Sequence, residues 1–138
     1  MNITKLQNFA HKCYLKKIPL IPQIYGKIMH HFYSCDIPYT ADIHRTVIFS
    51  HKGLGVVIGH DTVIGENTKL LHNVTIGGRA GVRANPVIGN NVLIGTGACV
   101  LGKVVIGDNV KIGANAVVID DIPSNCTVVG IPGKVIKR

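Results

Sequence analysis

The chain of 138 residues contains no tryptophan, and only 5% of its residues are aromatic. Most globular domains bury several aromatic rings. Because aromatic residues are scarce here, the core of this protein is predicted to consist of aliphatic and small side chains. Apolar residues make up 46% of the chain, which is too many for a disordered protein. At this length the chain is expected to form one domain.

Several other signals are missing. No apolar run reaches the roughly 18 residues of a membrane span, and the N-terminus lacks the features of a signal peptide, which predicts a cytoplasmic protein. The four cysteines form no CxxC pair, which argues against a zinc knuckle or a redox motif. The seven histidines include no closely spaced HxxxxH pair, so no metal site is predicted.

Acidic residues are also scarce, with seven Asp and Glu against fifteen Lys and Arg and a formal charge of +8. Such a balance suits nucleic acid, an anionic membrane surface or a polyphosphate cofactor. Basic residues do not alternate with aromatics as they do in single-strand binders, so no nucleic-acid partner is expected. The segment from Lys5 to Lys17 is basic and carries an apolar stripe, which leaves two interpretations open: contact with a membrane surface, or packing on the protein or another subunit.

A six-residue repeat occupies most of the chain. A large aliphatic residue recurs at every sixth position, and Gly follows directly in seven of the eleven cases. The series is Ile58, Ile64, Leu70, Ile76, Val82, Ile88, Ile94, Val100, Ile106, Ile112 and Val118. The repeated aliphatic residue would fill a narrow interior, and the residue after it would sit at a corner with left-handed backbone angles.

This pattern predicts an all-β fold, a single left-handed parallel β-helix of roughly four to five triangular coils. Ile37, Ile43 and Phe49 continue the spacing upstream, but the phase slips by three before Ile58. We therefore expect a short N-terminal helical segment of two helices in residues 1–35, the β-helix in residues 36–122, and a C-terminal cap with a basic tail in residues 123–138.

His51 lies at this phase slip, within the sequence Ser50-His51-Lys52-Gly53-Leu54-Gly55. Asp36 precedes it by fifteen residues, and the motifs GVVIG, NVTIGG, PVIG and VVGIPGKV follow. Together these motifs, which cover about three quarters of the chain, resemble serine O-acetyltransferases and related hexapeptide acyltransferases.

The resemblance implies an acetyl-CoA-dependent O-acetyltransferase in which His51 is the general base and Asp36 orients and charges it. An imidazole held by a carboxylate suits this step, because a hydroxyl needs a base with a pKa near 7 to attack a thioester. In the family the cofactor lies in a groove between two subunits of a homotrimer. The implied contacts to acetyl-CoA are Gly77, Gly78, Thr96, Ala114 and Lys134, with the backbone near the two glycines also available to the oxyanion.

The acceptor side departs from the family pattern. Ser50 stands where the serine enzymes have Asp, and Arg83-Ala84-Asn85-Pro86 replaces their Asp-Arg-His-Pro. Serine needs partners for its ammonium and its carboxylate, so we expect a sugar hydroxyl of a cell-surface polysaccharide as the acceptor, contacted by Ser50, Arg83 and Asn85. The alternatives are a serine O-acetyltransferase of cysteine biosynthesis and a non-catalytic trimeric scaffold.

Overall fold

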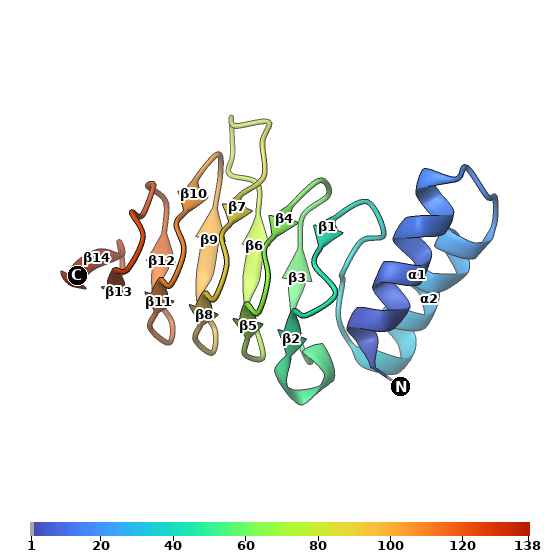
Figure 1. The fold of residues 1–138 in the computed structure, drawn as a ribbon, viewed down its shortest axis with the longest axis horizontal. Coiled ribbons are helices and arrows are strands. Elements are labelled where there is room, and N and C mark those ends of the chain that lie inside the picture. Colours follow the sequence, from blue (N-terminus) through green and yellow to red (C-terminus); the bar gives the residue numbers. More distant parts are fainter. Residues whose placement is uncertain (1) are drawn as a thin grey trace.

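The computed structural model describes residues 2–138 as a prism of stacked coils with two helices across its N-terminal end (Figure 1). The helices are α1 (Ile3–Leu15) and α2 (Ile21–Tyr33). The remaining elements are β1 (Asp42–Ile43), β2 (Ile48–Phe49), the 3₁₀ turn η1 (Ser50–Gly53), β3 (Val57–Ile58), β4 (Val63–Ile64), β5 (Lys69–Leu70), β6 (Thr75–Gly77), β7 (Val87–Ile88), β8 (Leu93–Ile94), β9 (Cys99–Leu101), β10 (Val105–Ile106), β11 (Lys111–Ile112), β12 (Val117–Val118), β13 (Thr127–Val129) and β14 (Lys134–Lys137).

Each coil contributes one strand to each of three walls, and strands of successive coils pair in parallel. Wall A contains β3, β6, β9 and β12, wall B contains β1, β4, β7 and β10, and wall C contains β2, β5, β8, β11, β13 and β14 in that order. Among the strands of residues 2–138, β14 alone is antiparallel, and it closes the last coil as a hairpin with β13. The chain is thus a left-handed parallel β-helix of about four turns preceded by two short helices, which confirms the predicted fold class.

The repeated aliphatic residues form the interior, as predicted, with one exception. Ile64, Ile76, Ile94 and their equivalents are almost completely buried, whereas Val82 is 38% exposed. Val82 belongs to a loop of residues 78–86 that projects beyond wall A and is bridged between Arg79 and Val82. The prediction for Val82 was wrong because six residues are inserted here, so the insertion keeps the period of the repeat without forming a wall.

Glycine is required at these positions of the repeat for a different reason from the one predicted. Left-handed angles occur two residues after these glycines, for example at Asn67 (φ 53°) and Asn91 (φ 55°), and not at the glycines themselves. At Gly65 an added Cβ would lie 2.7 Å from the carbonyl oxygen of Gly89 in the next coil. Close approach of consecutive coils therefore requires glycine at this position.

The two helices are held on the first coil by buried polar contacts. The Gln7 side chain is 1% exposed, and its Nε2 donates to the carbonyl oxygen of Ala41 at 2.8 Å. Thr4 Oγ1 donates to Val47 O at 2.9 Å, and Tyr25 OH donates to Ile37 O at 2.8 Å. These buried donors have hydrogen-bond partners only when the helices lie in this position. The hydrogen bonds therefore fix α1 and α2 as a layer against the end of the prism.

Candidate functional site

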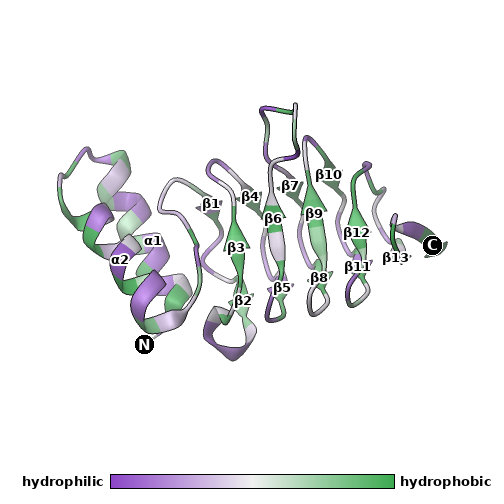
Figure 2. Ribbon diagram, turned by 180° about the vertical axis from the view of Figure 1, so that it is seen from behind, coloured by the Kyte–Doolittle hydropathy of each residue, from purple (hydrophilic) through white to green (hydrophobic). Residues whose placement is uncertain are grey.

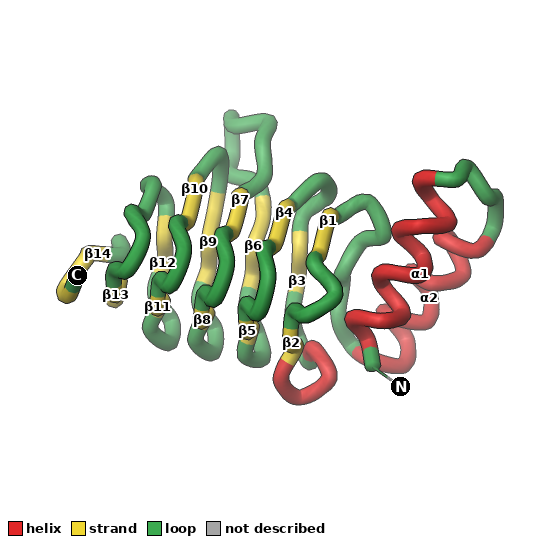
Figure 3. The backbone as a smooth tube through the Cα atoms, in the orientation of Figure 1, coloured by secondary structure: helices red, strands yellow, loops and turns green. Residues whose placement is uncertain are grey.

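The phase slip in the sequence forms η1, a tight turn that projects where wall C passes into wall A (Figure 3). His51 and Lys52 adopt left-handed angles with φ of 52° and 54°, and Gly53 follows with φ 71°. Three consecutive residues of this kind turn the chain outward and back within one coil. The turn therefore presents His51, an exposed side chain, at the edge of the prism.

Strand register places His72, Thr96 and Ala114 on the same edge of the prism as His51. Phe49, Leu70, Ile94 and Ile112 pair in consecutive coils of wall C. Two residues further along the chain, four consecutive coils present His51, His72, Thr96 and Ala114, which we call the corner column. At about 4.8 Å per coil the corner column is roughly 14 Å long. It unites the candidate base with two of the candidate acetyl-CoA contacts.

His72 is a residue that the sequence interpretation did not single out. Its ring meets that of His51 edge to face, with 5.0 Å between ring centroids and 85° between ring planes. Its Nδ1 is buried and is the one buried side-chain nitrogen or oxygen among residues 2–138 that has no hydrogen-bond partner. Counting the register of wall C from Phe49 to Leu70 would have placed His72 beside His51, but the phase slip concealed it.

Asp36 lies at the start of wall A, where it forms a parallel bridge with Val57. It lines a surface hollow of about 330 Å³ together with Ser34 and Gly55, and His51 lines a neighbouring hollow of about 390 Å³ that also contains Ser34. Within the described residues no side-chain hydrogen bond joins Asp36 to His51. The two groups are thus neighbours on the same corner, and the charged pair remains a prediction.

The negative charge of Asp36 contributes to the raised pKa values of two buried groups, the Cys35 thiol and the Tyr25 phenol. Burial, reinforced by the Asp36 carboxylate, raises the pKa of the Cys35 thiol from 9.0 to about 11. Burial also raises the pKa of the Tyr25 phenol, with smaller contributions from Cys35 and Asp36. Both groups are therefore neutral at physiological pH, and neither is a nucleophile for this site.

These shifts predict that stability falls as the pH rises above about 9, the ordinary pKa of the thiol. In the unfolded chain Cys35 loses its proton near that pH, whereas in the folded chain it keeps it up to about pH 11, so alkali favours the unfolded state. Urea midpoints measured at pH 8 and pH 10.5 should fall less in Cys35→Ala than in the unchanged protein. Cys99→Ala should keep the full decline, and equal declines in all three proteins would contradict the prediction.

The remaining candidate residues lie elsewhere on one chain. Gly77 ends β6 and Gly78 begins the 78–86 loop, so both lie at the far edge of wall A from η1. Nothing approaches within 4 Å of a Cβ placed on Gly77, so a ligand has open access there. Arg83 is exposed on the loop, and the Asn85 amide donates to the carbonyl oxygen of His60.

Ser50 and Lys134 are the last two site residues expected from the sequence. Ser50 is half-buried and lies beside His51 on η1. Lys134 begins β14 at the C-terminal end of the prism, beyond the last member of the corner column (Figure 1). A single chain therefore brings together Ser50, His51, Thr96 and Ala114, but not the glycines or the loop of Arg83.

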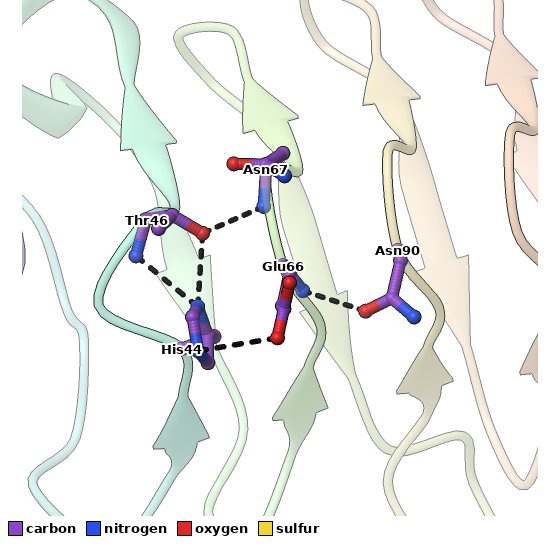
Figure 4. A network of polar contacts seen from close by, with 5 residues as sticks. All are labelled: His44, Thr46, Glu66, Asn67 and Asn90. Atoms are coloured by element: carbon purple, nitrogen blue, oxygen red, sulfur yellow. Dashed lines mark hydrogen bonds and ion pairs between the residues drawn. The ribbon is translucent and has the colours of Figure 1, made fainter.

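A second polar cluster, which joins His44, Thr46, Glu66, Asn67 and Asn90, has a structural role (Figure 4). His44 Nε2 lies 3.6 Å from Glu66 Oε1, while the Glu66 N–H donates to Asn90 Oδ1 at 2.7 Å and the Asn67 N–H donates to Thr46 Oγ1 at 2.8 Å. These bonds satisfy turn backbone groups between coils. Throughout residues 2–138, no three His, Cys, Asp or Glu side chains are grouped as metal ligands would be.

Comparison with protein families matches residues 85–120 to the bacterial transferase hexapeptide (six repeats). Among curated proteins, the serine acetyltransferase of Synechococcus elongatus is 40% identical over 131 residues, which are 94% of this chain and 53% of the relative. The serine acetyltransferase of Staphylococcus xylosus is 43% identical over 94% of this chain and 60% of its own length. The chain thus spans between about half and three fifths of these relatives.

Solved structures of serine acetyltransferases are also similar to this chain. Neisseria gonorrhoeae serine acetyltransferase in complex with serine has a TM-score of 0.87 and 36% identity, and covers 94% of this chain and 53% of its own. The Brucella abortus enzyme in complex with coenzyme A has a TM-score of 0.90 and 30% identity, and covers 97% of this chain and 54% of its own. The likeness includes α1 and α2 as well as the prism, since it covers almost the whole chain.

Proposed function

We propose that this chain, which belongs to the serine O-acetyltransferase-like family of hexapeptide-repeat proteins, transfers an acetyl group from acetyl-CoA to the hydroxyl of L-serine. The observation that carries the proposal is the corner column, which places the candidate base His51 in line with Thr96 and Ala114. Relatives that are serine acetyltransferases, and neighbours that bind serine and coenzyme A, support the two substrates.

The chemistry requires a base but no covalent enzyme intermediate. His51 accepts the proton of the acceptor hydroxyl as its oxygen attacks the thioester carbonyl carbon. The C–S bond then breaks, the acetyl group stays on the acceptor oxygen, and the departing thiolate takes up the proton. Donors near Gly77 and Gly78 would stabilise the oxyanion, because the absence of side chains lets the thioester approach the backbone.

This site needs more than one chain. Wall A separates η1 from Gly77, Gly78 and the loop of Arg83, so the base of one chain can meet these groups only on a neighbouring chain. We propose a homotrimer in which each site lies between two prisms. Its support is the row of exposed valines on wall B, where Val63, Val87 and Val105 pair in register and are 37%, 42% and 52% exposed.

Within the proposed site His72 is a positioning residue for His51. An edge-to-face aromatic contact restricts the rotation of the exposed His51 ring, and a base that is held in place transfers protons faster. The unpartnered Nδ1 of His72 has no structural benefit, because leaving a buried nitrogen unpaired costs about 1–3 kcal/mol.

We therefore expect His72→Leu to lower kcat about tenfold, with the dissociation constant of coenzyme A unchanged, because Leu cannot hold the ring. His72→Phe keeps the aromatic edge, so its kcat should stay within about threefold, and its Tm should rise because the unpaired nitrogen is gone. Both variants should be compared by kcat, KM and the pH profile of kcat/KM. Equal losses in the two variants would show that the ring contact has no positioning role.

The direct test of the function is release of the coenzyme A thiol with L-serine as the acceptor. A sugar hydroxyl remains the second candidate, because Ser50, Ala84 and Asn85 supply no charged partners for a zwitterion. The comparisons do not support that earlier expectation of a polysaccharide sugar, so simple sugars and lipid-linked oligosaccharides belong in the same assay. Release with a sugar and none with serine would overturn the proposed acceptor. No release with any acceptor, and no binding of coenzyme A at millimolar ligand, would favour the scaffold.

A further inference from the structure

The helical layer has an outer face that no other described part of the protein covers. In α1, residues Ile3, Gln7 and Ala10 point toward the prism and are buried. Residues Lys5, Phe9, Lys12 and Lys16 lie on the opposite side at helical spacing, and all four are exposed.

The second helix continues this face. Pro22, Tyr25 and Met29 are its buried residues, and Tyr25 is bonded to the first coil. The side away from them carries Ile24, Lys27 and His31, which are all exposed. Because both helices bury the side that meets the prism, these two rows form one surface, which we call the outer face. It lies across the end of the prism opposite the C-terminus (Figure 2).

The outer face is both apolar and positively charged. Phe9 is 56% exposed and Ile24 is 55% exposed. Residues 2–35 contain five lysines and no Asp or Glu, whereas all seven acidic residues of the chain lie between Asp36 and Asp121. Large exposed apolar side chains surrounded by lysines, with no acidic residue among them, are typical of a surface that lies on anionic lipid.

We propose that the outer face docks the protein on an anionic membrane surface, with Phe9 and Ile24 in the lipid interface and the lysines on the headgroups. A second copy of the chain is a poorer partner for the outer face, because pairing two outer faces would bring the lysines of both copies together. A nucleic acid would use the lysines but leave the apolar side chains exposed. No helix in residues 2–138 is long and apolar enough to cross a bilayer, so the contact is peripheral.

Docking in this way would leave the corner column accessible. The axis of the prism would stand upright on the membrane, with the helices beneath and the C-terminus away from the lipid (Figure 1). His51 lies on the coil nearest the helices, and its hollow is also lined by Phe32, which is 81% exposed. The proposal does not depend on the acetyl transfer, since it concerns a different face.

The test is sedimentation with vesicles of phosphatidylglycerol and phosphatidylcholine, compared with vesicles of phosphatidylcholine alone. We expect binding to the anionic vesicles only, and release when the salt is raised from about 0.05 to 0.5 M. Lys12→Glu with Lys16→Glu should lower the partition coefficient at least about tenfold, and Phe9→Asn with Ile24→Asn should lower it at least about fivefold. These positions are exposed, so folding should persist, and circular dichroism checks this.

The matched control is Lys103→Glu with Lys111→Glu, which makes the same change of net charge on exposed positions of the prism. Its binding should stay within about twofold of the unchanged protein. Equal losses in the two lysine pairs would overturn the outer face as the site, as would the absence of binding to anionic vesicles. If the Phe9 and Ile24 changes lower the mass of the particle in sedimentation equilibrium, the face joins copies of the chain and the proposal is wrong.

Discussion

Replacing His51 by alanine should lower kcat for acetyl transfer by about two to four orders of magnitude. The loss arises because the acceptor hydroxyl then keeps its proton, and His72, the other imidazole of the corner column, does not line the hollow. The affinity for coenzyme A should be unchanged, since the base acts on the acceptor and not on the cofactor. The measurements are thiol release under saturating substrates and calorimetry with coenzyme A.

The matched control is His60→Ala, another exposed histidine at a corner of the prism, whose ring nitrogen bonds Thr40 Oγ1 at 2.8 Å. Its kcat should stay within about twofold. If His51→Ala and His60→Ala have the same rate as the unchanged protein, the base is a different residue. If His51→Ala also loses coenzyme A binding, the residue contributes to the cofactor site or to assembly.

Asp36→Asn should have a milder effect than His51→Ala. Asparagine leaves a polar side chain near the imidazole but removes the charge that would stabilise the imidazolium as the proton is transferred. The same change should lower the pKa of the Cys35 thiol, because the carboxylate is the second cause of its increase. Thiol alkylation as a function of pH therefore reports whether Asp36 is ionised, independently of turnover.

The sequence predicted the prism because its interior depends on one residue type at one spacing. Ile58, Ile76 and Ile94 need only be aliphatic and six residues apart to fill a coil, and that is a local property. Val82 shows the limit of this reasoning, since an insertion of six residues is invisible to a count with a period of six. Only the pairing of β6 with β9, and of β4 with β7, reveals which residues are stacked.

The candidate site was only partly predictable for a related reason. His51 and Asp36 were identified from motifs, but the contact between His51 and His72 depends on two coils meeting at one corner. The slip before Ile58 hides that register, because η1 takes up extra residues before wall A resumes. The outer face depends likewise on which side of α1 meets the prism, and the buried Gln7 settles this point.

Ser50→Asp combined with Ala84→Arg and Asn85→His should raise kcat/KM for L-serine by about 10- to 100-fold, mainly through a lower KM. The proposed trimer brings the 78–86 loop of one chain to the η1 turn of the next. In the unchanged protein Ser50 precedes His51 in place of an acidic residue, the Asp36 carboxylate is assigned to the imidazole, and only Arg83 of that loop is available to the serine carboxylate. An unpaired charge held away from water costs several kcal/mol, so serine should bind weakly, with kcat/KM below about 10⁴ M⁻¹s⁻¹.

The control is an acceptor without charges, N-acetylserine amide, for which the triple variant should give no gain. Asn85→His alone should cost stability, because it removes the amide that donates to His60 O, so the Tm of each variant is needed beside its rate. A gain with both acceptors would mean that the substitutions improve assembly rather than recognition. If the unchanged protein already acetylates serine above 10⁴ M⁻¹s⁻¹, the charges of serine are met by other residues, and Arg83→Ala then becomes the informative variant.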